Sequence, residues 1–76
     1  MNIKEVTIHT TQNVMIDLDT TGADLLPGDT YVAKRNEGVG WLMFTCNYVD
    51  LGQGWVVPNE AGYWFDLSEC HKVVIQ

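Results

Sequence analysis

The pattern of apolar and polar positions predicts a chain of short β-strands. In residues 14–19 apolar side chains alternate with others, and Asp17 and Asp19 fall on the face opposite the apolar one. Such alternation over four to eight residues is typical of a strand with one buried face. Residues 3–9 follow a similar pattern, and the polar run 10–13 predicts that the two strands form a hairpin. The side chains expected to face inward are Val6, Ile8, Val14, Ile16 and Leu18.

Four further strands are expected after this hairpin. Their ranges are 30–35, 41–48, 55–57 and 72–75, and glycine- and proline-bearing turns separate them. The strand 41–48 is apolar on both faces, which is typical of a central strand or of one whose outer face meets a partner. Its predicted core-facing side chains are Leu42, Phe44, Cys46 and Tyr48, and those expected on the other face are Trp41, Met43 and Thr45. Leu25 and Leu26, in the irregular stretch 19–29, are expected to tuck under the sheet.

Residues 66–70 are expected to form one helical turn before the last strand. Asp66 stands at the N-cap and Glu69 three positions later, which is the spacing of a capping box. Five or six short strands and no long helical pattern predict an all-β fold. The expected architecture is a small SH3-like barrel or a curled antiparallel sheet, with one short helical turn near residues 66–70. With 76 residues the chain is expected to form a single domain.

The charge balance narrows the classes of partner. The chain has 10 Asp and Glu against 4 Lys and Arg, for a net charge of −6, and its only adjacent cations are Lys34 and Arg35. Proteins that bind nucleic acid need clustered cations to displace counterions from phosphate groups. Direct binding to DNA, RNA or an anionic membrane is therefore not expected. A basic protein partner fits the charge, because opposite potentials steer encounter.

The N-terminus has no apolar core of a secretory signal, and no apolar run reaches the length of a membrane helix. We therefore expect a cytoplasmic location, where Cys46 and Cys70 are expected to stay reduced, although a disulfide between them is geometrically open.

A resemblance to known proteins rests on residues 27–70. A Pro-Gly-Asp turn leads into a strand, Trp41 starts the next one, and Gly54-Trp55-Val56-Val57-Pro58 precedes a helical turn and a closing strand. This pattern resembles SH3-like barrels. The runs 31–36, 45–46, 54–58 and 65–70 are also similar to small uncharacterised proteins of tailed bacteriophages. The chain departs from peptide-binding SH3 domains, because the Ala-Leu-Tyr-Asp-Tyr-like run is absent and the excursion after Pro58 is longer. The resemblance implies no proline-rich ligand; it implies binding to a host protein, in the host cytoplasm.

The sequence contains parts of motifs for metal binding and catalysis, but each lacks a residue or a spacing that the motif requires. Asp17, Asp19 and Thr21 match the first positions of a calcium loop, but Gly28 stands where the bidentate glutamate belongs. Cys70 and His71 are adjacent, so an extended chain sends them to opposite faces, and neither cysteine has the paired spacing of a zinc knuckle. A cysteine nucleophile needs an electropositive setting, whereas Asp66 and Glu69 flank Cys70. We expect no enzyme activity, no metal and no cofactor.

The aromatic side chains are the sharper indication of function. Eight of them exceed what a small barrel buries, and 63–65 are three consecutive aromatic residues, so at least one points outward. Trp and Tyr are enriched in the energetic centres of protein interfaces. The expected anchors are Trp41, Trp55, Tyr63 and Trp64. The expected acidic rim is Asp17, Asp19, Asp24 and Glu60.

Three functions fit these observations. The preferred one is a small acidic, non-enzymatic module that binds a protein and modulates or inhibits a host factor. The second is a structural or assembly subunit that forms a homo-oligomer through its aromatic face. The third is an acidic mimic of DNA that blocks a host DNA-binding enzyme, whose binding would then fall with salt.

Overall fold

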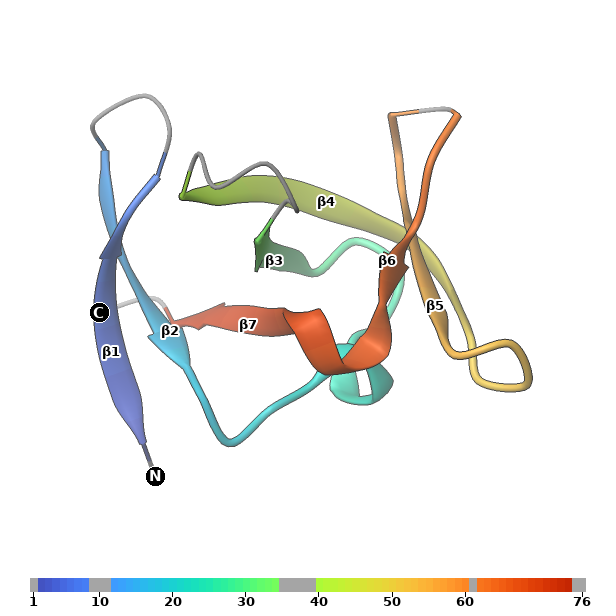
Figure 1. Ribbon diagram of the computed structural model, residues 1–76, viewed down its shortest axis with the longest axis horizontal. Helices are drawn as coiled ribbons and strands as arrows, with labels where there is room; N and C mark the ends of the chain where they lie inside the picture. Colours follow the sequence, from blue (N-terminus) through green and yellow to red (C-terminus); the bar gives the residue numbers. More distant parts are fainter. Residues whose placement is uncertain (1, 9–11, 35–39, 61, 75–76) are drawn as a thin grey trace.

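The computed structural model describes residues 2–8, 12–34, 40–60 and 62–74. In chain order these residues form β1 (Ile3–Thr7), β2 (Asn13–Asp17), the 3-10 helix η1 (Gly22–Asp24), β3 (Thr30–Lys34), β4 (Trp41–Asp50), β5 (Trp55–Pro58), β6 (Phe65–Asp66), the 3-10 helix η2 (Leu67–Glu69) and β7 (Cys70–Val74) (Figure 1). The predicted all-β class is confirmed. The described residues hold seven strands rather than five or six, because the two-residue β6 carries too little alternation to be recognised in the sequence.

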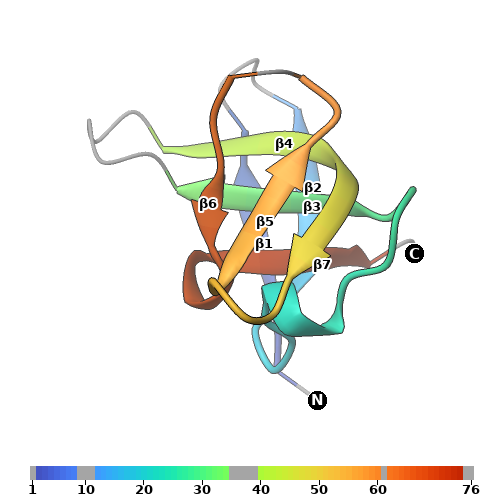
Figure 2. The ribbon, with the colours of Figure 1, turned by 90° about the vertical axis from the view of Figure 1, so that its right-hand side faces the viewer.

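The strands form one antiparallel sheet in the order β1-β2-β7-β3-β4-β5-β6. The pairs β1–β2, β3–β4, β4–β5 and β5–β6 join strands that follow one another in the chain, whereas β7 lies between β2 and β3. The sheet curls without closing: Figure 2 shows β4 bending from its neighbour β3 towards β5 at the front. A single parallel bridge between Ile8 and Trp41 brings the chain after β1 against the start of β4. Of the two architectures expected from the sequence, the curled sheet is the one formed.

A β-bulge in β4 changes which side chains point inward. Cys46 pairs with Pro58 and Tyr48 with Val57, so one extra residue lies on β4 between the two pairs. An extra residue inverts the alternation of a strand beyond that point. Val49 consequently packs against the core, whereas Tyr48 is 48% exposed. The expectation that Tyr48 shares the inner face of Cys46 was wrong for this reason.

The curl encloses apolar side chains on both faces of the sheet. The first core contains Leu25, Tyr31, Ala33, Cys46, Val56, Phe65 and Cys70, and the second contains Val6, Ile8, Ile16 and Val32. Strand β3 contributes to both, since Val32 points to one face and its two neighbours to the other. Among the expected inward residues Leu25 is buried, but Leu26 is 67% exposed. The expectation for Leu26 was wrong because neighbouring side chains of an extended segment point in opposite directions, so that Leu26 faces solvent when Leu25 faces the core.

The capping box is at η1 and not at the predicted position. The Thr21 hydroxyl accepts a hydrogen bond from the Ala23 N–H at 3.3 Å, and the Asp24 carboxylate accepts one from the Thr21 N–H at 2.9 Å. At η2 the predicted box is absent, because the Asp66 side chain makes no capping hydrogen bond. The 3-10 turn itself, at Leu67–Glu69, agrees with the expected position.

The Tyr31 hydroxyl gives a testable feature of the first core. Tyr31 is fully buried and packs against the rings of Phe44 and Phe65, at centroid distances of 5.7 and 6.3 Å. Its hydroxyl has no hydrogen-bond partner among the described residues. Burying a hydroxyl without a partner costs about 1–3 kcal/mol.

We therefore expect Tyr31→Phe to raise the free energy of unfolding by about 1–2 kcal/mol. Urea denaturation followed by far-UV circular dichroism measures the change. Tyr48→Phe is the matched control, since the exposed phenol of Tyr48 is solvated in both states. A Tyr31→Phe variant less stable than wild type would show that the hydroxyl is satisfied in the native protein.

Candidate functional site

The outer surface of β4, β5 and β6 carries a group of exposed aromatic side chains. Val56 and Phe65 point into the first core, so the residues that alternate with them along β5 and β6 point outward. The outward residues include Trp55 and Val57, and Tyr48 joins them because it pairs with Val57 across the strands. We refer to the set Tyr48, Trp55, Val57 and Trp64 as the outer aromatic face. It lies at the end of the sheet opposite β1 and β2 (Figure 1).

Trp55 and Trp64 form the centre of this face. Their ring centroids are 4.5 Å apart with an angle of 30° between the ring planes. Such offset aromatic pairs are worth about 0.5–1.5 kcal/mol beyond the area they bury. Trp64 nevertheless stays 53% exposed, and Tyr48 is 48% exposed. The two rings therefore stabilise one another while Trp64 still presents apolar surface to solvent.

Carboxylates flank the aromatic pair on both sides. Trp55 lies directly opposite Asp50 of β4 and directly opposite Asp66 of β6, so the three side chains form one row across the strands. Asp50 Oδ1 accepts a hydrogen bond from the Gln53 N–H at 3.0 Å, which fixes that carboxylate at the turn. The exposed Asp66 carboxylate takes part in no hydrogen bond or ion pair within the described parts of the chain. No Lys or Arg occurs between residues 36 and 71.

The structure separates the four expected aromatic anchors. Trp55 and Trp64 come together, but Trp41 starts β4 at the other end of the sheet. The half-buried Trp41 packs against the second core, with its ring centroid 5.9 Å from that of His71. Tyr63 packs on the first core, 5.9 and 5.7 Å from the rings of Phe44 and Phe65. Of the expected anchors, only Trp55 and Trp64 belong to the outer aromatic face.

Three of the four expected rim acids shape the loop between β2 and β3. The Asp17 carboxylate accepts a hydrogen bond from the Asp19 N–H at 2.9 Å, which is the hydrogen bond of an Asx turn. The Asp19 carboxylate accepts one from the Asn2 N–H at 2.8 Å, and Asp24 belongs to the capping box. Glu60 lies exposed just after β5. The carboxylates of Asp17, Asp19 and Asp24 therefore stabilise the loop between β2 and β3. The carboxylates that lie in register with Trp55 are instead those of Asp50 and Asp66.

Sequence reasoning missed Tyr48 and Asp66 for identifiable reasons. The bulge that turns Tyr48 outward lies in a part of β4 without glycine or proline, and its one signal, Pro58, is on the partner strand β5, where it was interpreted only as the end of that strand. Asp66 was interpreted as a helix cap, a role that its spacing to Glu69 favoured. The segment 36–71 around Trp55 and Trp64 contains no Lys or Arg. This absence of positive charge was the sequence signal that could have identified Asp50 and Asp66 as acids without a cation nearby in the sequence.

The two cysteines lie in the first core as free thiols. Burial is the main cause that raises the pKa of Cys70 to about 12, with Glu69 and Asp66 contributing. Burial likewise raises the pKa of Cys46. Both groups are consequently neutral thiols at pH 7, and Cys70 Sγ donates a hydrogen bond to the Asp66 carbonyl oxygen at 3.3 Å. Within the described residues no three His, Cys, Asp or Glu side chains are grouped to hold a metal ion.

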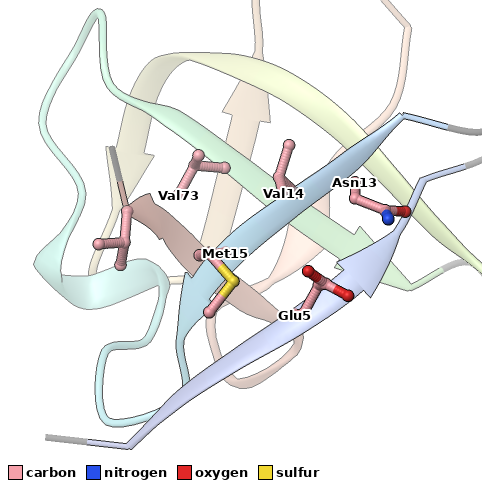
Figure 3. Close-up of a pocket in the computed structure, with 6 residues that line it drawn as sticks. Glu5, Asn13, Val14, Met15 and Val73 are labelled. Atoms are coloured by element: carbon pink, nitrogen blue, oxygen red, sulfur yellow. The ribbon is translucent and has the colours of Figure 1, made fainter. Parts of the chain in front are cut away.

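Two shallow cavities lie away from the outer aromatic face. One, of about 210 Å³, lies on β1, β2 and β7 and is lined by Glu5, Asn13, Val14, Met15, Val73 and Val74 (Figure 3). The other, of about 290 Å³, lies beside the ion pair between Lys72 Nζ and Asp29 Oδ2, which are 3.5 Å apart. Small-molecule sites usually enclose about 300–1,000 Å³. Both cavities are therefore at or below the usual size of such sites.

The chain matches no family model, and no curated protein or solved structure is similar to it at a significant level. Among the described residues, no helix has the length and apolar character needed to cross a membrane.

Proposed function

We propose that this chain is a non-enzymatic binding protein that docks another protein on its outer aromatic face. The observation that carries the proposal is the Trp55–Trp64 pair, whose tilted rings contact one another with centroids 4.5 Å apart while Trp64 stays 53% exposed. Tryptophan contributes disproportionately to the binding energy of protein interfaces. A rigid pair also loses little conformational freedom on binding, which favours affinity.

The surroundings of the pair support the same function. Tyr48 and Val57 extend the apolar surface along β4 and β5, and Trp64 directly precedes β6, which pairs with β5. A contiguous exposed apolar patch with a polar rim is typical of interaction sites. Val56 and Phe65, the core-facing neighbours of Trp55 and Trp64 in the chain, are buried and anchor this part of β5 and β6 to the first core.

The kind of partner is proposed from the resemblance to small bacteriophage proteins. That resemblance implies that the partner is a host protein, which this chain would modulate or inhibit. The proposal therefore includes a bacterial cytoplasmic partner. A DNA-mimic function receives less support, because backbone N–H groups hold Asp17, Asp19 and Asp24 in the loop between β2 and β3, where they form no extended row of carboxylates along a strand.

Trp64→Ala is expected to weaken partner binding by about 2 kcal/mol or more, which is roughly a 30-fold rise in Kd. The partner is first captured from bacterial lysate with the tagged wild-type chain and then purified. Isothermal titration of the purified pair gives the Kd of each variant.

The matched control for this experiment is Leu26→Ala. Leu26 is 67% exposed, lies on the loop before β3 and is equally apolar, but it is outside the outer aromatic face. We expect Leu26→Ala to bind like wild type. A folded Trp64→Ala protein that binds with unchanged Kd would refute the proposed face. A wild-type chain that only associates with itself would favour the homo-oligomer instead.

A further inference from the structure

We infer that the outer aromatic face recognises an arginine side chain of its protein partner, with the guanidinium stacked on the Trp55–Trp64 pair between Asp50 and Asp66. This inference rests on the proposed function and specifies the chemistry that the face selects.

The first argument is the placement of charge. Asp50, Trp55 and Asp66 are directly opposite one another on three adjacent strands, so an aspartate stands beside Trp55 on each neighbouring strand, the Asp50 carboxylate at the edge of the turn that follows β4. Directly opposite residues have Cβ atoms about 4.5–5.5 Å apart. A cation placed over the indole would therefore lie within reach of both carboxylates.

The second argument is that nothing described in the chain neutralises these acids. The described cations Lys4 and Lys34 belong to β1 and β3, and Lys72 of β7 pairs with Asp29. The segment 36–71 supplies no Lys or Arg. Asp66 has no ion pair or side-chain hydrogen bond within the described residues. Within the parts of the chain that the structure describes, no cation pairs with Asp50 or Asp66, so these carboxylates are open to a cation of a partner.

The third argument is the match between these groups and guanidinium chemistry. A cation over the face of an indole is attracted by the ring quadrupole, and tryptophan gives the strongest such interaction. Arginine is planar and weakly hydrated, so it stacks on aromatic rings while its N–H groups donate to carboxylates at its edges. The ammonium of lysine is a compact and strongly hydrated charge that gains less from a flat indole pair. The combination of flat rings and lateral carboxylates favours arginine.

The probe is the peptide acetyl-Gly-Arg-Gly-Arg-Gly-amide, and its partner peptide carries citrulline in place of arginine. Citrulline keeps the shape of the side chain and removes its charge. The ¹⁵N-labelled protein reports binding through the three indole N–H resonances. Trp41 serves as an internal reference, because it lies at the opposite end of β4.

We expect the arginine peptide to shift the indole signals of Trp55 and Trp64 and to leave that of Trp41 in place. Citrulline and lysine peptides should give at least fivefold weaker binding. Asp66→Asn should weaken arginine binding about three- to fivefold, as loss of an exposed ion pair does. Asp50→Asn should act similarly, since Asn keeps the Oδ1 acceptor for the Gln53 N–H. Asp24→Asn removes the same charge from the distant loop and should have little effect.

Two results would overturn the inference. Equal shifts with the citrulline peptide would show that charge is not recognised, and equal binding of the lysine peptide would show that the guanidinium is not selected. Failure of the inference is distinguishable from failure of the proposed function. If Trp64→Ala abolishes binding of the captured partner while Asp50→Asn and Asp66→Asn do not change it, the face binds protein without an arginine. If Trp64→Ala leaves partner binding intact, the proposed function itself fails.

Discussion

Replacing Gly22 by alanine is expected to lower the free energy of unfolding by about 1–3 kcal/mol, the usual range for overpacking at a tight contact. Gly22 begins η1 and is buried against η2 and β5. A Cβ atom at this position would lie 2.5 Å from Val56 Cγ2 and 2.9 Å from the Leu67 Cα. Backbone atoms are involved, so no side-chain rotation relieves the overlap. Two loops that are distant in sequence would have to move apart and open the first core.

For a domain whose total stability is about 5 kcal/mol, such a loss removes a large fraction of the stability and shifts the urea midpoint well below that of wild type. Gly52→Ala is the matched control, because a Cβ there would meet only Asp50 Oδ1, at an ordinary distance of 3.5 Å. Urea denaturation of both variants measures the difference. Equal stability of Gly22→Ala and wild type would contradict the close packing of η1 on η2.

The second large effect is expected at alkaline pH. The pKa of Cys70 is raised from 9.0 to about 12, chiefly by burial, so the folded protein holds this proton to higher pH than the unfolded chain. Burial also raises the pKa values of Cys46 and Tyr31. Because these folded-state pKa values lie above the unfolded ones, the stability is complete below pH 9 and is lost as pH rises. Cys70 alone is expected to remove about 1.4 kcal/mol per pH unit between pH 9 and 12.

Urea midpoints between pH 7 and 11 measure this loss. The Cys70→Ala variant has no thiol to deprotonate at this position, so its stability should fall less steeply above pH 9 than that of wild type. Its lower stability at pH 7, from the small cavity, does not affect this comparison of slopes. A wild-type stability that stays constant up to pH 11 would contradict the burial of these groups. Identical slopes for wild type and Cys70→Ala would exclude Cys70 as a cause.

The local elements of the fold were largely predictable from the sequence. Alternation identified β1 and β2 as a hairpin with Val6 and Ile16 inward, because a half-buried strand has a period of two. The position of β7 between β2 and β3 was not predictable, since it depends on contacts distant in sequence. The capping box at Thr21 was missed because Asp24 takes the place usually held by Glu or Gln.

The candidate site was predictable only in part. Three consecutive aromatic residues required one to point outward, and Trp64 does so while Phe65 is buried. The partnership of Trp64 with Trp55 depends on the register of β5 with β6, which the sequence does not encode locally. Trp41 was placed in the site from its alternation, but packing of β1 and β2 covers that face with the second core. Tertiary packing thus decided which aromatic side chains remained at the surface.

The central claim is that the partner covers the outer aromatic face, and oxidative footprinting by mass spectrometry tests it most directly. Hydroxyl radicals label exposed tryptophan side chains in the free protein and in its complex with the captured partner. We predict that labelling of Trp64 falls at least fivefold in the complex while labelling of Leu26, exposed on a different loop, stays unchanged. Equal labelling of Trp64 in the free and bound protein would show that the partner binds elsewhere and would contradict the account.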